Sequence, residues 1–140
     1  MIFGSGMLSQ LPTAHAETHT VVLPHALAYN APAIPHVMEK LRNVLGHQHP
    51  ATALFELVGR IGAPRSLREI GMPADGIEVA TERALANPYW NPQPLERDGI
   101  RALIAPAYAG DAPAVLPFRA ETGRRMVPEL SPATLGAPQA

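Results

Sequence analysis

The stretch AETHTVVLPHALAY, residues 16–29, predicts the helix around which the rest of the chain is arranged. The stretch reads as a helix with the apolar residues Val21, Val22, Leu23, Leu27 and Ala28. Pro24 lies inside this stretch, where it removes one backbone hydrogen bond and its ring meets the carbonyl four residues earlier. We therefore expect a kink in this helix at Pro24.

Apolar residues three and four positions apart recur along the chain and predict helices over residues 34–45, 50–61, 77–85 and 95–108. Ser66 and Glu69 have the spacing of a capping box and predict a short turn between two of these helices. Asp75 is expected to cap the helix that follows it, and Pro106 to disrupt the last turn of the final helix. No segment favours a strand, so the predicted fold is all-α, a bundle of five to six short helices.

Composition excludes several classes of protein. The 140 residues carry a formal net charge of −1, without the basic patch that nucleic-acid binding requires. The chain has no cysteine, which excludes disulfides, thiolate metal sites and cysteine nucleophiles. No stretch is long and apolar enough to span a membrane, so no membrane partner is expected and the predicted location is the cytoplasm. Helical periodicity stops near residue 110, and the proline-rich residues 111–140 are expected to form a flexible tail.

The histidines near the start of the chain are the candidates for chemistry. His15 and His19 are four residues apart, so on a helix they share a face and could bind one divalent cation. The alternative is that both are ordinary solvent-exposed histidines on one helix face, which would have the same spacing. Glu17 lies between them on the opposite side of the helix, which excludes the zinc-protease arrangement. His25 is either a third functional histidine or a hydrogen-bonded histidine within the helix packing.

One aromatic pair, Tyr89 and Trp90, lies in a proline-rich loop. We expect it to cover the end of the bundle rather than to contact a ligand. His36, His47 and His49 flank turns or exposed faces and are assigned no chemistry. The chain has neither a glycine-rich dinucleotide-binding motif nor a serine nucleophile motif.

Several of these segments together resemble the maleylacetate reductases, within the iron-containing alcohol dehydrogenase superfamily. The resemblance rests on AHAETHTVVLPHALAYN (14–30), IGAPRSLR (61–68), IGMP (70–73), ANPYWNP (86–92) and RDGIR (97–101). It covers about residues 14–110, which it identifies as similar to the family's C-terminal helical domain.

The resemblance implies an oxidoreductase that reduces maleylacetate to 3-oxoadipate with NADH or NADPH, in the breakdown of aromatic compounds. The implied active site lies in a cleft between the helical domain and an N-terminal cofactor domain. His15 matches a metal ligand of the metal-dependent relatives, which hold iron or zinc, and His19 and His25 match positions near the cleft that we assign to catalysis. A cation or a protonated imidazole would polarise the substrate while the cofactor supplies hydride.

The chain also departs from the family pattern. The cofactor domain and the upstream metal ligands are not present in these residues, so the metal-ligand set is incomplete, and Met1 stands where the family has a further histidine. Residues 1–13 form a divergent N-terminal segment, and residues 111–140 match no part of the family. We therefore expect a fragment that is active only when the missing cofactor domain is supplied. The expected partners are a separately encoded cofactor domain or further copies of the chain in a homo-oligomer. The alternative is a non-catalytic helical remnant or oligomerisation module.

Overall fold

The structure is a computed structural model that describes residues 15–114. Within this range it has five α-helices, one 3-10 helix and no strand: α2 (His15–Asn30), η1 (Ala31–Ala33), α3 (Pro35–Leu45), α4 (Pro50–Arg60), α5 (Gly76–Ala86) and α6 (Arg97–Ala109). The predicted all-α bundle is confirmed. No helix in residues 15–114 is both long and apolar enough to cross a bilayer. The predicted segment 1–13 and residues 115–140 of the predicted tail lie outside the described residues.

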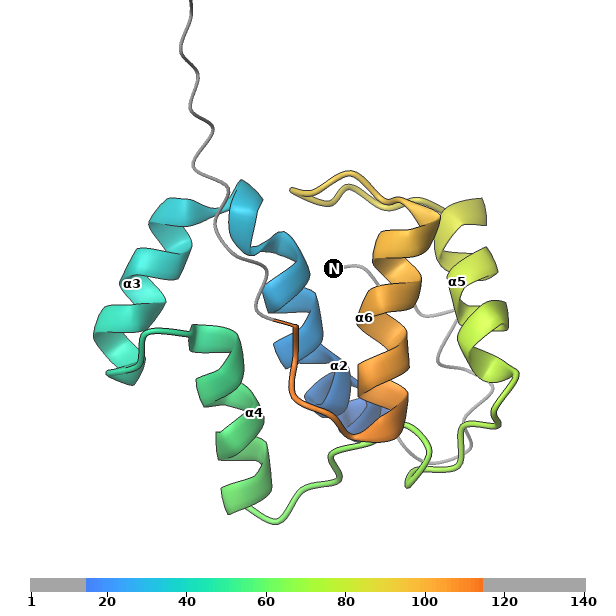
Figure 1. Ribbon diagram of the computed structural model, residues 1–140, viewed down its shortest axis with the longest axis horizontal. Helices are drawn as coiled ribbons and strands as arrows, with labels where there is room; N and C mark the ends of the chain where they lie inside the picture. The colour runs from blue at the N-terminus through green and yellow to red at the C-terminus, as the bar shows by residue number, and fades with distance from the viewer. Residues whose placement is uncertain (1–14, 115–140) are drawn as a thin grey trace, which may run out of the picture.

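Helix α2 is the centre of the bundle (Figure 1). It packs against α4 on one side and α6 on the other, and α5 packs against α6. Helix α3 lies at the edge, where it contacts α4 and η1. The helix with the three candidate histidines is therefore positioned by two others.

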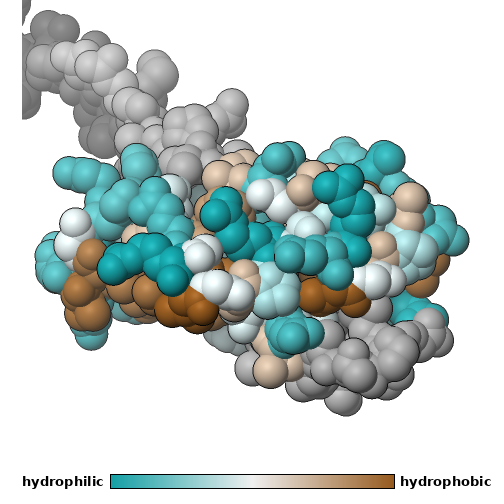
Figure 2. All heavy atoms as spheres, turned by 90° about the horizontal axis from the view of Figure 1, so that it is seen from below, coloured by the Kyte–Doolittle hydropathy of each residue, from teal (hydrophilic) through white to brown (hydrophobic). Residues whose placement is uncertain are grey.

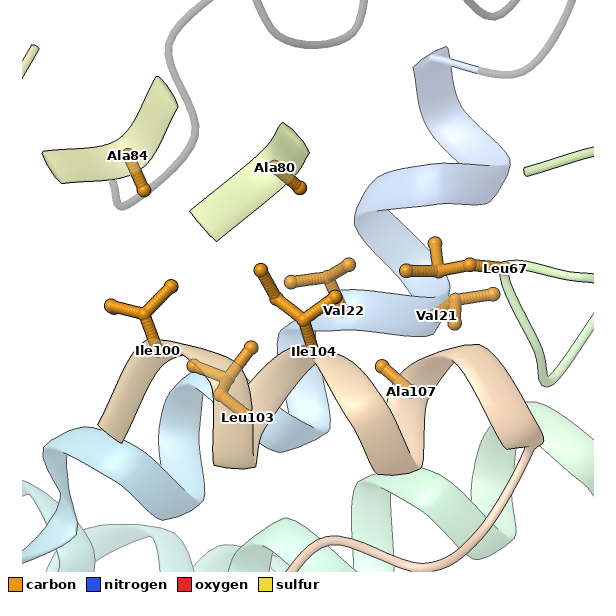
Figure 3. Packing of buried hydrophobic residues seen from close by; sticks show 9 residues of the cluster. All are labelled: Val21, Val22, Leu67, Ala80, Ala84, Ile100, Leu103, Ile104 and Ala107. Carbon is orange, nitrogen blue, oxygen red and sulfur yellow. The ribbon is translucent and has the colours of Figure 1, made fainter. Parts of the chain in front are cut away.

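The main core lies where α2, α5 and α6 meet (Figure 3). Helix α6 contributes one face at helical spacing, and α2 and the loop before α5 complete it with branched side chains. The small alanines of α5 let that helix approach α6 closely. The buried cluster consists of Val21, Val22, Leu67, Ala80, Ala84, Ile100, Leu103, Ile104 and Ala107.

Two prolines lie inside helices. Helix α6 continues through Pro106 to Ala109, so the expectation that this proline disrupts the last turn is wrong. The cost of one missing hydrogen bond is offset by the burial of Ile104 and Ala107 on either side of it. Gly110 ends the helix in the left-handed conformation, at φ 85°. Helix α2 likewise continues across Pro24 to Asn30, and the kink there stays a prediction.

The two predicted caps have different outcomes. The backbone N–H of Glu69 donates to Ser66 Oγ over 3.1 Å, and residues 67–70 form the short turn that was predicted. The Glu69 carboxylate accepts from the N–H of Arg65, one residue before the position that a capping box requires. The Asp75 side chain makes no capping bond, so that prediction is wrong. Its backbone is already helical, at φ −74° and ψ −10°, whereas a capping side chain needs an extended backbone.

Candidate functional site

Helix α2 carries the three predicted site residues. His15 is its first residue, and the structure gives only its place in the helix. His19 is half-buried, and His25 is buried with 2% of its surface exposed. Six residues separate His19 from His25, so their side chains point roughly 120° apart around the helix. The structure therefore does not bring these two histidines to one face.

His25 is buried, and its ring makes no hydrogen bond within residues 15–114. Neither Nδ1 nor Nε2 has a hydrogen-bond partner in the part of the chain that the structure describes. The Phe55 ring of α4 meets the imidazole edge to face, with 6.2 Å between ring centroids. The expectation of a histidine in the helix packing is right about burial but wrong about hydrogen bonding.

Burial controls the protonation of His25. Desolvation lowers the pKa of this imidazole from 6.5 to about 4, because the low-dielectric surroundings disfavour the charged ring. The negative charge of Asp111 acts in the opposite direction and raises the pKa by a smaller amount. At neutral pH the ring is therefore uncharged, with one nitrogen as donor and the other as acceptor.

Thr18 lies two helical turns before His25 and shares its face of α2, because seven residues make nearly two full turns. Its side chain is 4% exposed, and Oγ1 has no hydrogen-bond partner among residues 15–114. Buried polar atoms without partners are rare in folded proteins, and each one calls for an explanation. One face of α2 thus presents, at two positions, polar atoms that have no partner in the described part of the chain.

Asp111 comes near His25 because of how α6 ends. Its backbone N–H and that of Gly110 both donate to the carbonyl of Pro106, over 3.0 and 2.9 Å. The left-handed conformation of Gly110 then turns the chain back toward α2 and α4 (Figure 1). The sequence interpretation assigned Asp111 to a tail, and nothing in the local pattern indicates this return.

Asn30 at the end of α2 was not recognised as a structural residue from the sequence. Its Oδ1 accepts hydrogen bonds from Asn91 Nδ2 over 2.8 Å and from the backbone N–H of Gln93 over 3.2 Å. The Tyr29 hydroxyl donates to the carbonyl of Pro94 in the same loop. These bonds anchor residues 91–94 to the helix that carries the histidines.

The aromatic pair in this loop does not cover the bundle. Trp90 is 83% exposed and Tyr89 is 54% exposed, so the predicted plug is wrong. The loop is anchored through Asn30 and Tyr29 instead, which leaves the aromatic side chains directed toward solvent.

No group of three or more His, Asp or Glu residues that could hold a metal ion occurs within residues 15–114. The other histidines belong to other segments than α2. His36 is exposed on α3, and His47 and His49 form a turn in which the backbone N–H of His49 donates to His47 Nδ1 over 3.0 Å.

Comparison with known proteins shows which family of proteins these residues match. Residues 7–108 match the C-terminal part of the Fe-containing alcohol dehydrogenase family. A maleylacetate reductase of Sphingobium indicum is 52% identical over 99 residues, which are 71% of this chain and 28% of that protein. A maleylacetate reductase of Pseudomonas knackmussii is also 52% identical, over 74% of this chain and 29% of that protein.

A solved structure has the same arrangement of helices. The maleylacetate reductase from Rhizobium sp. strain MTP-10005 superimposes with a TM-score of 0.71 at 38% identity, over 76% of this chain and 30% of that one. The chain thus spans less than a third of the length of the relatives it matches.

Proposed function

Because the chain belongs to the iron-containing alcohol dehydrogenase family, we propose that it supplies the helical wall of a maleylacetate reductase active site. The reaction is the reduction of maleylacetate to 3-oxoadipate by NADH or NADPH. In this proposal His25 and His19 contact the substrate, and His15 is a metal ligand. The remainder of the site comes from residues outside the described part of the chain.

The observation that carries this proposal is the imidazole of His25, which is buried and has no hydrogen-bond partner among the described residues. Leaving a buried polar group without a hydrogen bond costs about 1–3 kcal/mol. A histidine kept in this state is explained if a substrate atom completes its hydrogen bonds. Ionisable groups with strongly shifted pKa values cluster at functional sites, which adds support.

The neutral form of His25 fits a particular role. An uncharged imidazole donates one N–H, and that donor can polarise a ketone oxygen while negative charge develops on it. The ring is buried, and a hydrogen bond in low-dielectric surroundings is stronger than one in water. The sequence interpretation invoked a protonated imidazole, whereas a pKa of about 4 favours the neutral ring until an anionic substrate binds. We assign His19, on a neighbouring face, to orienting a substrate carboxylate.

The cofactor and the metal enter only as family expectations. NADH or NADPH supplies the hydride when it is bound, and the chain contains no glycine-rich sequence that would hold its pyrophosphate. The described residues do not form a metal-ligand set, so we derive no step through a metal. His15 would be one ligand among several, and the rest would come from outside residues 15–114.

A second candidate function, an oligomerisation module, is favoured by the apolar surface of α3 and α4. Val44 is 82% exposed, Ile61 67% and Leu57 42%. The face drawn in Figure 2 shows apolar surface on the side of the molecule where these two helices lie. A stable homo-oligomer with no activity in any restored enzyme would favour this alternative.

A chimera tests the main proposal. Residues 14–110 replace the matching segment of the Sphingobium indicum maleylacetate reductase, and NADH oxidation is measured with maleylacetate. We expect turnover, and we expect His15→Ala and His25→Gln each to reduce it by about a hundredfold or more. His36→Gln on the exposed face of α3 is the matched control and should leave the rate unchanged. A folded but inactive chimera contradicts the proposal.

A further inference from the structure

A groove opens between α2, η1, α3 and the start of α4. Its volume is about 790 Å³. Most of its lining is apolar. The apolar lining residues are Ala28, Ala31, Pro32, Pro35, Met38, Pro50, Ala51 and Ala114, and the polar lining residues are His36, Glu39, Arg42, Gln48 and His49.

The chain itself leads into this groove. After Gly110 the backbone turns away from α6 and runs back between α4 and α2 (Figure 1). Gly110 is required there, because a Cβ at this position would lie 3.1 Å from the Ser66 Cβ, in a left-handed conformation. Pro113 is buried, and Ala114, the last described residue, lines the groove.

We propose that this groove is the docking site of the apolar segment Val115–Phe118 of the same chain. The four residues that follow Ala114 are Val, Leu, Pro and Phe, and Arg119 then begins a more polar stretch. An apolar segment that starts at the edge of an apolar groove lowers the free energy by entering it. Proline disfavours helical backbone at the residue before it, so the sequence Leu116-Pro117 favours an extended segment, which suits a groove between helices.

The occupant is this segment and not a second copy, because of the covalent connection. Ala114 already lies in the groove, so Val115 needs no linker to reach it and its effective concentration there is high. Association with another chain would have to displace a segment that is attached in place. The docking is independent of catalysis, and residues 115–118 lie beyond the stretch 7–108 that matches the family.

The absence of cysteine from the chain allows a direct test. Leu116→Cys and Leu135→Cys each introduce a single thiol, one in the proposed docked segment and one near the end of the chain. Their reaction rates with a soluble aromatic disulfide reagent report how exposed each thiol is. We expect the thiol at position 116 to react about tenfold or more slowly, at a rate independent of protein concentration.

A second substitution shows whether the groove is the cause. Pro35→Glu places a charge at the groove wall, at a helix N-terminus that tolerates an acid. Pro73→Glu, exposed and outside the groove, is the control. Pro35→Glu should restore fast reaction at position 116, and Pro73→Glu should not. Equal rates at positions 116 and 135, or protection that Pro35→Glu leaves intact, would overturn the proposal. Protection that grows with protein concentration would assign the groove to a second copy.

Discussion

Replacing the buried imidazole with a hydrocarbon should make this protein more stable, although it removes the residue proposed for catalysis. His25→Leu deletes two ring nitrogens that have no hydrogen-bond partner in the described chain. Leucine has a similar volume and no polar atom, so it leaves nothing unsatisfied. A histidine retained for structure would show the opposite result.

The size of the gain follows from two opposing effects. Each unsatisfied buried polar atom costs about 1–3 kcal/mol. Two losses oppose this gain. The edge-to-face contact with Phe55 is lost, at about 1 kcal/mol, and the different shape of leucine costs up to about 1.5 kcal/mol. The free energy of unfolding should therefore rise by roughly 1–2 kcal/mol at pH 7.5.

Urea denaturation followed by circular dichroism at 222 nm measures this change. Thr18→Val and Thr81→Val are a matched pair of controls, because both hydroxyls are buried but only that of Thr81 donates a hydrogen bond, to the Ile77 carbonyl over 2.8 Å. Thr18→Val should stabilise and Thr81→Val should not. If His25→Leu lowers the free energy of unfolding by more than about 1 kcal/mol, the imidazole is a structural group and the reasoning fails.

Four further outcomes are expected. Between pH 6.5 and 4 the unfolded chain binds a proton at His25 that the folded chain does not, so the free energy of unfolding should fall by about 3 kcal/mol by pH 4 through this residue. Urea denaturation at a series of pH values measures this fall, which His25→Leu should not show. Ile104→Ala, at 1% exposure, should cost roughly 3 kcal/mol by urea denaturation, whereas Val44→Ala, at 82%, should cost less than about 0.5 kcal/mol. Asn30→Ala should cost about 1–2 kcal/mol and speed amide exchange at Gln93, whose N–H it leaves unpaired, as measured by NMR. The 140-residue chain alone should not oxidise NADH with maleylacetate, and measurable turnover would contradict this.

Local sequence patterns predicted most of the fold. Apolar spacing predicted every α-helix in residues 15–114 to within two residues at each end, and each of α3–α6 buries at least one residue of its apolar pattern, which in α3 is Met38 alone. The errors arose where tertiary contacts override local chemistry. The last turn of α6 survives Pro106 because Ala107 is fully buried, and Asp75 fails as a cap because its backbone is already helical.

The site was less predictable than the fold. Resemblance singled out His25, but its contact with Phe55 of α4 and the nearby charge of Asp111 arise from tertiary packing. The hydrogen bonds of Asn30 join residues about sixty positions apart, and no local signal indicates them. The exposure of Trp90 follows from that anchoring, so it could not be deduced from composition either.

The most direct test of the central claim compares His25→Gln with wild type in the Sphingobium indicum chimera, with kcat and KM measured separately. If His25 polarises the substrate during hydride transfer, kcat should fall by about a hundredfold or more while KM changes little. The His36→Gln chimera should retain the wild-type kcat. A His25→Gln chimera with undiminished kcat would contradict the claim and leave His25 as a buried residue without a catalytic role.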